Sequence, residues 1–427
     1  RRSPFLIMEH QQVDSKYLEE LRSFNSDQVD ISLVLGSPGV DALTSCRDMM
    51  LNASKSVLMQ DDVYGLFNYG PEAGKQTTRE NLSHFLTEQY GDSVNCSDVM
   101  ITAGATQGLH VVLSLLCQKS SPVFIEDPSY FIGYRVMRDD FQMNLVPVPP
   151  DTDGMNTDVL DEMLTSYKSN ANTVQSNNRY WAVVYLIPVF NNPTGGSYSI
   201  DRCKKLVELA RKHDVLLIAE DVYNLLYFVD KNQAPPRLIS FDKKSDPDYG
   251  RGHVISLGTF SKILAPSLRL GWMEGSTQMI SVLIKSNLAF SGGCFNHYTS
   301  MLVSSFLNSE VFLSHIKFLR EIYKRKMDTL CSVLDEHILE GSTYHKPQGG
   351  FFLWIIFRPD VDAFQFLRFA VQKYRVSFMP GICCSPTGSF KNCARLSISN
   401  NREDIISEGA KKLCAAYQDF ISTLDRS

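Results

Sequence analysis

The chain has 427 residues, of which 44% are hydrophobic and 21% are charged, and its formal net charge is −5. A chain of this length can bury one large core, or a large core and a smaller one. The negative charge argues against general affinity for nucleic acid, which depends on a basic surface, and no apolar run is long enough to predict a membrane span. We therefore expect a globular protein that binds neither nucleic acids nor membranes.

Ten cysteines are scattered along the chain. They form no CxxC pair and have no histidines at the spacing of metal sites, so we predict reduced thiols and no bound metal. The cytoplasm is the predicted location. Mitochondria are the alternative if the N-terminus is a processed end, because the opening RRSPFLIM is basic and apolar but too short for a signal peptide.

Short apolar runs alternate with longer amphipathic stretches over the first two thirds of the chain. Buried strands are predicted at 98–104, 121–127, 180–188, 215–221 and 253–258. Helices are predicted around them, at 77–91, 106–118, 157–167 and 200–213. This alternation predicts an α/β fold in which helices cover a mostly parallel central sheet.

A second, smaller α/β domain is predicted for the C-terminal third. After about residue 290 the sequence changes to long helical stretches, which two short strand patterns and a final helix follow, at 349–356, 394–399 and from 402. The predicted division is an N-terminal arm with part of the small domain at 1–60, a large ligand-binding domain at 61–290, and the small C-terminal domain at 291–427.

Residues that can do chemistry follow each predicted strand. Ligands of parallel sheets bind beyond the carboxyl ends of the strands, so we expect these residues to meet at one edge. The small residues of Ala103–Gly108 let backbone N–H groups at a helix start face an anion, although an ordinary strand-to-helix turn has the same composition. Tyr130 either stacks on a planar ligand or covers the core. Asn192 lies in an Asn-Pro-Thr-Gly turn, where the X-Pro bond is a candidate for the cis form.

The fourth and fifth strands are followed by two acids and by a lysine. Glu220 and Asp221 end a run that reads as fully buried, where carboxylates need a cation or a donor. Lys262 stands in the nearly uncharged stretch SLGTFSKILAPSLRLGW at 256–272. It either extends to solvent or is a desolvated amine with a lowered pKa, able to form Schiff bases.

Together these strand ends offer the groups that pyridoxal 5′-phosphate requires. Two hydroxyls and a guanidinium near the lysine suit a phosphate dianion, and they belong to Thr259, Ser261 and Arg269. An acid can keep the pyridine nitrogen protonated, which makes the ring an electron sink. Each motif alone is weak, but five of them at successive strand ends predict a pyridoxal-phosphate site.

The chain resembles the fold-type-I pyridoxal-phosphate aminotransferases of class I and II, and most closely their α-aminoadipate, kynurenine and aromatic branch. The resemblance runs from about Leu35 to the last helix, and TFSKILAPSLRLGW is its most specific part. It implies that Lys262 forms the Schiff base with the cofactor. It also implies the phosphate ligands, which are Thr259, Ser261, Arg269 and the backbone of Ala105 and Thr106.

The same resemblance assigns the contacts of the ring and of the substrate. Tyr130 resembles the residue that stacks on the pyridine ring, and Asn192 and Tyr223 resemble the pair that hydrogen-bonds its phenolic oxygen. The substrate carboxylate is implied to bind Arg395, with Asn192 and the backbone of Gly36 beside it.

The acid expected at the ring nitrogen departs from the family pattern. The family usually has an aspartate three residues before the tyrosine of the pair, and here Glu220 stands three residues before Tyr223, with Asp221 next to it. Side chains alternate on a strand, so only one of the two acids can face the ring. The spacing favours Glu220, whereas the fixed distance favours a shorter acid, and the prediction leans slightly toward Asp221.

The implied activity is a ping-pong transamination through pyridoxamine phosphate, with Lys262 as the general base. The favoured donors are L-amino acids of the aromatic, kynurenine-like or 2-aminoadipate type, and the acceptor is a 2-oxo acid such as 2-oxoglutarate. Tyr69 resembles the tyrosine that reaches the phosphate of a neighbouring subunit, which implies a homodimer with shared active sites.

Three alternatives stay open. The same residues serve a pyridoxal-phosphate β-lyase, and the Glu220 departure leaves room for a catalytically degenerate family member. The fold also occurs as the effector-binding half of transcriptional regulators. That role needs a DNA-binding module, and the segment before Leu35 is neither long nor basic enough for one.

Overall fold

The computed structural model describes residues 16–24, 27–118, 121–170, 180–337 and 339–426. The opening segment RRSPFLIM lies outside these ranges. Within them, no helix is both long and apolar enough to cross a membrane. In the same ranges, no three His, Cys, Asp or Glu side chains gather as they do around a metal ion.

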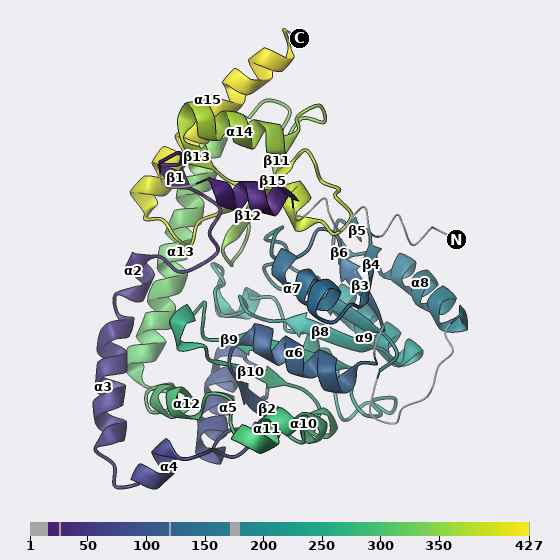
Figure 1. Ribbon diagram of the computed structural model, residues 1–427, viewed down its shortest axis with the longest axis vertical. Helices are drawn as coiled ribbons and strands as arrows, with labels where there is room; N and C mark the ends of the chain where they lie inside the picture. The colour runs from purple at the N-terminus through teal and green to yellow at the C-terminus, as the bar shows by residue number, and fades with distance from the viewer. Residues whose placement is uncertain (1–15, 25–26, 119–120, 171–179, 338, 427) are drawn as a thin grey trace.

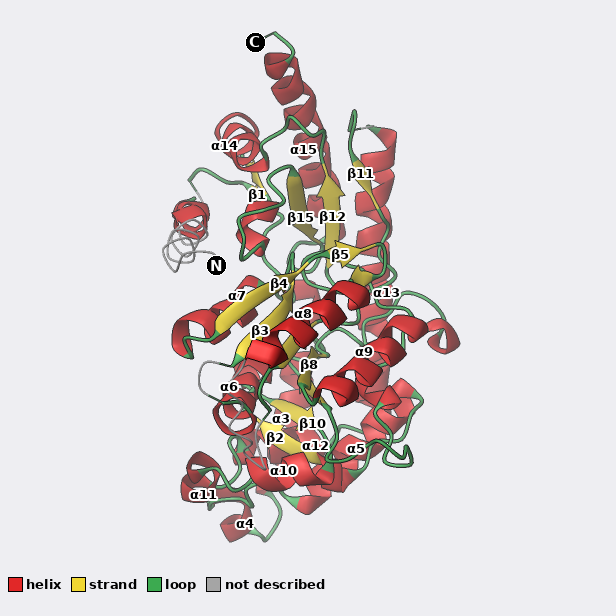
Figure 2. Ribbon diagram, turned by 90° about the vertical axis from the view of Figure 1, so that its right-hand side faces the viewer, coloured by secondary structure: helices red, strands yellow, loops and turns green. Residues whose placement is uncertain are grey.

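A seven-stranded sheet occupies the centre of the larger part of the molecule, with the strand order β2-β10-β9-β8-β7-β3-β4 (Figure 2). The strands are β2 Val99–Thr102, β3 Pro122–Glu126, β4 Asn144–Val148, β7 Val183–Leu186, β8 Leu216–Glu220, β9 Val254–Thr259 and β10 Gly271–Glu274. All neighbours pair in parallel except β10, which is antiparallel to both β2 and β9. The predicted mostly parallel sheet is therefore confirmed.

Two strands of this sheet were not predicted, and each has a local reason. β4 contains Pro147, which breaks the apolar run but is tolerated because β4 lies at the edge of the sheet. β10 begins with a glycine and ends with the charged residue Glu274, which is buried in a pair with the Arg237 guanidinium. A scan for apolar runs passes over both patterns.

Helices cover both faces of the sheet. Phe124, Val184 and Leu217 pack in one core with α8 (Thr157–Asn170) and α9 (Ile200–His213). Their neighbours in the strands point to the opposite face, where α6 (Ala105–Leu116) packs against them. This alternation along each strand explains why the runs read as continuously apolar. The other helices of this part are α5 Gln76–Tyr90, α7 Phe131–Arg135, α10 Thr277–Leu283, α11 Asn287–Gly292 and α12 His297–Ser304.

A smaller antiparallel sheet lies at the other end of the molecule, with the order β11-β12-β15-β14 (Figure 1). Its strands are β11 Thr343–Tyr344, β12 Phe352–Ile356, β14 Met379–Pro380 and β15 Cys393–Ser397. Three helices belong to this part of the fold, namely α13 Glu310–Glu336, α14 Ala363–Tyr374 and α15 Glu403–Leu424. The two strand patterns and the final helix predicted here are present.

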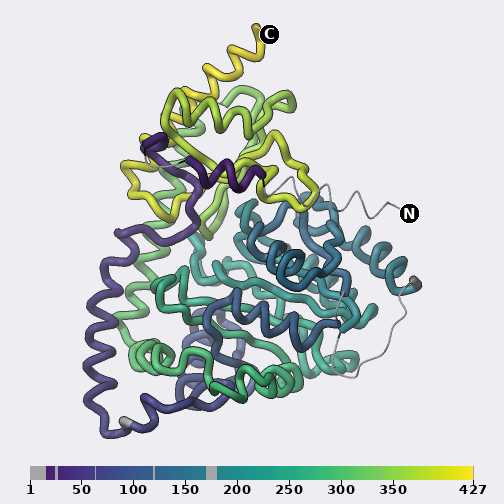
Figure 3. The backbone as a smooth tube through the Cα atoms, viewed as in Figure 1, coloured from purple at the N-terminus to yellow at the C-terminus, as the bar shows by residue number. Residues whose placement is uncertain are grey.

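The N-terminal segment joins the C-terminal part. β1 (Ile31–Ser32) pairs in parallel with β13 (Val376–Ser377), and Figure 3 shows the purple segment against the yellow-green one. The chain then passes through α2 (Val40–Leu43), α3 (Cys46–Leu58) and α4 (Val63–Phe67) toward the large sheet. The two remaining short strands, β5 Pro150–Asp151 and β6 Gly154–Met155, form a hairpin. The domain boundaries stay a prediction.

Candidate active site

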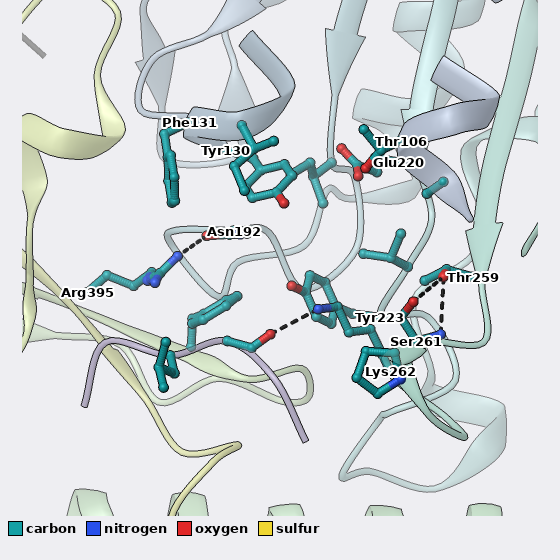
Figure 4. A pocket seen from close by; sticks show the side chains of 18 of the residues that line it. Thr106, Tyr130, Phe131, Asn192, Glu220, Tyr223, Thr259, Ser261, Lys262 and Arg395 are labelled. Carbon is teal, nitrogen blue, oxygen red and sulfur yellow. Dashed lines mark hydrogen bonds between the residues drawn. The ribbon is translucent and has the colours of Figure 1, made fainter. Parts of the chain in front are cut away.

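A cavity of about 290 Å³ lies beyond the carboxyl ends of the parallel strands. Its walls come from the large sheet, the N-terminal segment and the small sheet (Figure 4). Most of the predicted site residues line it, namely Gly36, Ala105, Thr106, Tyr130, Asn192, Glu220, Tyr223, Thr259, Ser261, Lys262, Arg269 and Arg395. Two predicted residues do not line it, Tyr69 and Asp221.

Lys262 follows β9 and reaches across the cavity to the N-terminal segment. Its Nζ donates a hydrogen bond to the Gly36 carbonyl oxygen at 2.9 Å (Figure 4). Burial lowers the pKa of Lys262 to about 8; Glu220 opposes this shift, and Arg395 and Arg269 add to it. A substantial fraction of the amine is therefore neutral near physiological pH, which makes it a nucleophile and a base.

The Thr259–Arg269 turn and the start of α6 gather hydrogen-bond donors. The Thr259 and Ser261 hydroxyls lie 3.0 Å apart, and the Ser261 amide donates to Thr259 Oγ1 at 3.1 Å. Arg269 donates to the Pro266 carbonyl at 3.0 Å. Gly104 precedes α6 with a φ of 96°, and a Cβ there would lie 3.0 Å from the Arg269 guanidinium. This close approach brings a cation, two hydroxyls and a helix N-terminus to one end of the cavity, as a phosphate dianion requires.

The two neighbouring acids at the end of β8 lie in different surroundings. Glu220 lines the cavity and accepts a hydrogen bond from the Tyr185 hydroxyl. Asp221 lies outside the cavity, where it accepts hydrogen bonds from Ser256 Oγ at 2.6 Å and Asn224 Nδ2 at 3.0 Å. The structure therefore brings Glu220 to the cavity and not Asp221, toward which the prediction leaned. Successive side chains of a strand point in opposite directions, so the position along β8 decides and not the length of the acid.

Arg395 on β15 forms the opposite end of the cavity. Its guanidinium donates to Asn192 Oδ1 at 2.8 Å and to the Val34 carbonyl at 2.7 Å, and it lies 4.2 Å from the ring centre of Phe352. Its Nε is buried and has no partner among the described residues. Burial lowers the pKa of Arg395. A buried guanidinium with an unused donor is suited to bind a carboxylate.

Three further predicted residues connect these two ends. Asn192, which precedes a cis proline bond as its sequence allowed, accepts a hydrogen bond from Arg395 and lines the cavity together with Tyr223. Burial raises the pKa of Tyr223, so its phenol stays protonated. Tyr130 is partly buried, and Figure 4 shows its ring at the cavity wall near Glu220.

The comparisons with known proteins agree with this geometry. The family described as aminotransferase class I and II matches residues 37–413. The chain belongs to this family. It is similar to the aromatic-amino-acid aminotransferase 1 of Thermococcus litoralis, with 28% identity over 91% of this chain and 88% of that protein.

Two solved structures share the fold. The kynurenine aminotransferase of Pyrococcus horikoshii is 28% identical with a TM-score of 0.80, over 95% of this chain and 94% of that one. The α-aminoadipate aminotransferase of Thermus thermophilus, solved with N-(5′-phosphopyridoxyl)-L-leucine, is 25% identical with a TM-score of 0.78, over 95% of both chains. The predicted family and fold are confirmed, and the protein is a pyridoxal-phosphate-dependent aminotransferase.

The cavity of this aminotransferase fits its family's cofactor. The donors at the start of α6 suit the phosphate, the Glu220 carboxylate suits a ring nitrogen, and Lys262 suits the aldehyde. The buried, unpartnered Nε of Arg395 is left for a substrate carboxylate. Tyr69 is 80% exposed and does not line the cavity of its own subunit.

Sequence reasoning missed two residues that shape the site. Phe352 supports Arg395, but it stands in the apolar run GGFFLWII, where nothing separates it from a core residue. Tyr185 holds Glu220, but it lies inside a buried strand. One signal was available for Tyr185, because a buried tyrosine hydroxyl usually finds a hydrogen-bond partner.

Proposed function

We propose that this aminotransferase moves the amino group of an aromatic, kynurenine-like or 2-aminoadipate-type L-amino acid to a 2-oxo acid such as 2-oxoglutarate. One observation carries the proposal: a largely buried lysine with a lowered pKa lies in one cavity with Glu220 and Arg395. The printed names of the similar aminotransferases support these donors. The two half-reactions follow a ping-pong order, in which the first oxo acid leaves before the second binds.

Each residue of the cavity has a task in this reaction. Bound pyridoxal 5′-phosphate supplies an electron sink that stabilises negative charge on the substrate Cα. Arg395 binds the substrate carboxylate through its free Nε, and Asn192 holds the guanidinium in place. Lys262, favoured in its neutral form by burial, takes the proton from Cα and returns it during the transfer. Glu220, which lines the cavity, is the residue that would hold a proton at the ring nitrogen of the bound cofactor.

The walls near Arg395 favour aromatic donors over 2-aminoadipate. They are built from Phe131, Ile132, Phe352 and Met379. The cationic side chains that line the cavity within the described residues are Lys262, Arg269 and Arg395, and each already has a task. A second carboxylate on the donor would therefore face an apolar wall of this subunit without a cation.

The homodimer is part of the proposal. Helices α3, α4 and α11 lie near one end of the molecule (Figures 1 and 2). These helices, together with Met59 directly after α3, expose large apolar side chains. These are Leu51, Leu58, Met59, Tyr64, Phe67, Leu288 and Phe290. A second copy covers this surface, which would otherwise face water, and Tyr69 just after α4 reaches the partner's phosphate. In analytical ultracentrifugation we expect a dimer, and Phe67→Glu to shift it toward monomer with a loss of cofactor.

A panel of amino donors tests the activity. The purified, cofactor-loaded protein is incubated with L-tryptophan, L-kynurenine, L-2-aminoadipate or L-alanine, each with 2-oxoglutarate and, separately, with pyruvate. We expect oxo-acid production that needs an acceptor and is fastest with the first two donors. Ammonia release without an acceptor would identify a β-lyase instead. No turnover of any donor, with cofactor bound, would identify a degenerate family member.

A further inference from the structure

Tyr185 lies inside β7 and makes the contact that holds Glu220. β7 pairs in parallel with β8, and Tyr185 is opposite Ile218, so its long side chain reaches along the neighbouring strand to Glu220 at the strand end. Its hydroxyl donates to Glu220 Oε2. Both side chains are buried, and within the described part of the chain no other group hydrogen-bonds this carboxylate.

A glycine on the neighbouring helix, Gly133, leaves space for the Tyr185 hydroxyl. A Cβ placed on Gly133, in α7, would lie 2.3 Å from the Tyr185 hydroxyl oxygen and 2.8 Å from the ring carbon that bears it. Neither contact is possible between nonbonded atoms. The hydroxyl is therefore confined between the backbone of α7 and Glu220. α7 directly follows Tyr130, another residue of the cavity wall.

Glu220 needs such a contact more than its neighbour does. Asp221 has one donor for each carboxylate oxygen, from Ser256 and Asn224. Glu220 has one more methylene group and thus one more rotatable bond, which raises the entropic cost of holding its carboxylate in one place. With Oε2 held by Tyr185, the other oxygen is left for a group in the cavity.

We propose that Tyr185 is a positioning residue for Glu220, and that Gly133 provides the space it needs. The tyrosine hydroxyl compensates for the longer acid by fixing its carboxylate at the cavity wall. This inference rests on the proposed function, in which Glu220 faces the ring nitrogen of the cofactor. The same hydroxyl lowers the pKa of Glu220, whereas burial, the larger effect, raises it.

A double-mutant cycle between Tyr185→Phe and Glu220→Asp tests the inference. The readouts are the dissociation constant of pyridoxal 5′-phosphate from the apoenzyme and kcat. Tyr185→Phe is expected to weaken cofactor binding about tenfold and to lower kcat by a similar factor, as for a lost hydrogen bond to a charged group. Glu220→Asp withdraws the carboxylate from the hydroxyl, so the second substitution should then change little and the coupling should be about tenfold.

The matched control is Tyr180→Phe, which also removes a buried hydroxyl, bonded to the Gly252 carbonyl and far from the cavity. It should stay within about twofold of wild type in both readouts. Gly133→Ala is the second test, because it keeps the hydroxyl and takes its space. It should weaken cofactor binding in the same direction as Tyr185→Phe. Circular dichroism and thermal unfolding check that each variant is folded.

A crystal structure of Tyr185→Phe adds a readout that does not depend on activity. We expect the Glu220 carboxylate to occupy more than one position there. A single wild-type position, wild-type cofactor affinity, or additive effects in the cycle would each overturn the inference while leaving the proposed function standing. A wild-type protein that binds no pyridoxal 5′-phosphate would overturn both.

Discussion

The two ends of the cavity are assembled in different ways. At the phosphate end, the contacts stay within the large-sheet part of the molecule: Thr259 bonds Ser261, two residues away, and Arg269 approaches Gly104 at the start of α6. At the carboxylate end, Arg395 bonds residues that are 203 and 361 positions away, Asn192 and Val34. The contribution of one subunit to the first end therefore needs only the large sheet and the turns and helix that follow its strands. The second requires three distant segments to meet, so we expect it to control substrate binding more than cofactor binding.

Lys262 lies between the two ends, and its removal should have the largest effect. Lys262→Ala is expected to lower kcat by about 10³-fold or more, because both the nucleophile and the base are lost. The phosphate end is intact, so the variant should still retain pyridoxal 5′-phosphate on ultrafiltration. Lys262→Arg is the control that keeps the charge and cannot form the Schiff base. Turnover within tenfold of wild type in either variant would contradict the assignment.

Arg395→Ala tests whether substrate binding at one end is independent of cofactor binding at the other. The KM of the amino donor should rise about 100-fold, as expected when one partner of a buried charge pair is removed, whereas cofactor affinity should stay within about threefold. Steady-state kinetics and cofactor titration measure the two effects. Arg368→Ala is a suitable control, because Arg368 pairs with Glu20 at the surface, away from the cavity. A loss of cofactor affinity as large as the rise in KM would show that the ends are not independent.

The two neighbouring acids at the end of β8 can be substituted one at a time, since Glu220 lines the cavity and Asp221 does not. Glu220→Gln should lower kcat about tenfold or more, because an amide does not hold the ring proton. Asp221→Asn keeps a similar shape beside Ser256 and Asn224 and should change kcat less than about threefold. Both enzymes are assayed at saturating donor and cofactor. If Asp221→Asn lowered kcat more than Glu220→Gln, Asp221 would be the acid that acts at the cofactor ring.

The smallest expected effect is a shift in the pH dependence of cofactor attachment. Only the neutral Lys262 amine attacks an aldehyde, and the pKa of Lys262 is lowered to about 8, so the attachment rate of the apoenzyme should rise with pH to a plateau above that value. Arg395 and Arg269 contribute to the lowering, and Glu220 opposes it. Arg395→Ala should therefore move the midpoint to higher pH, measured by stopped-flow absorption. An unmoved midpoint would show that Arg395 does not act on Lys262.

Much of the cofactor end could be predicted because local order determines it. Thr259 ends β9, and Ser261 and Lys262 follow it within three residues. Parallel pairing brings that strand end to the edge where β7 and β8 also end. Phe352 and Tyr185 could not be predicted, because each stands in an apolar run where a site residue and a core residue look the same. Their partners, Arg395 and Glu220, lie on other strands.

Local patterns in the chain were enough to predict the family, the mostly parallel sheet and the chemical groups at its edge, since periodicity and strand-end motifs are local properties. The tertiary structure alone decided which of the two acids enters the cavity, through the direction in which each side chain leaves β8. It also decided that a tyrosine from β7 holds Glu220 and that Gly133 leaves it room. Such contacts depend on the packing of neighbouring elements, which no local pattern records.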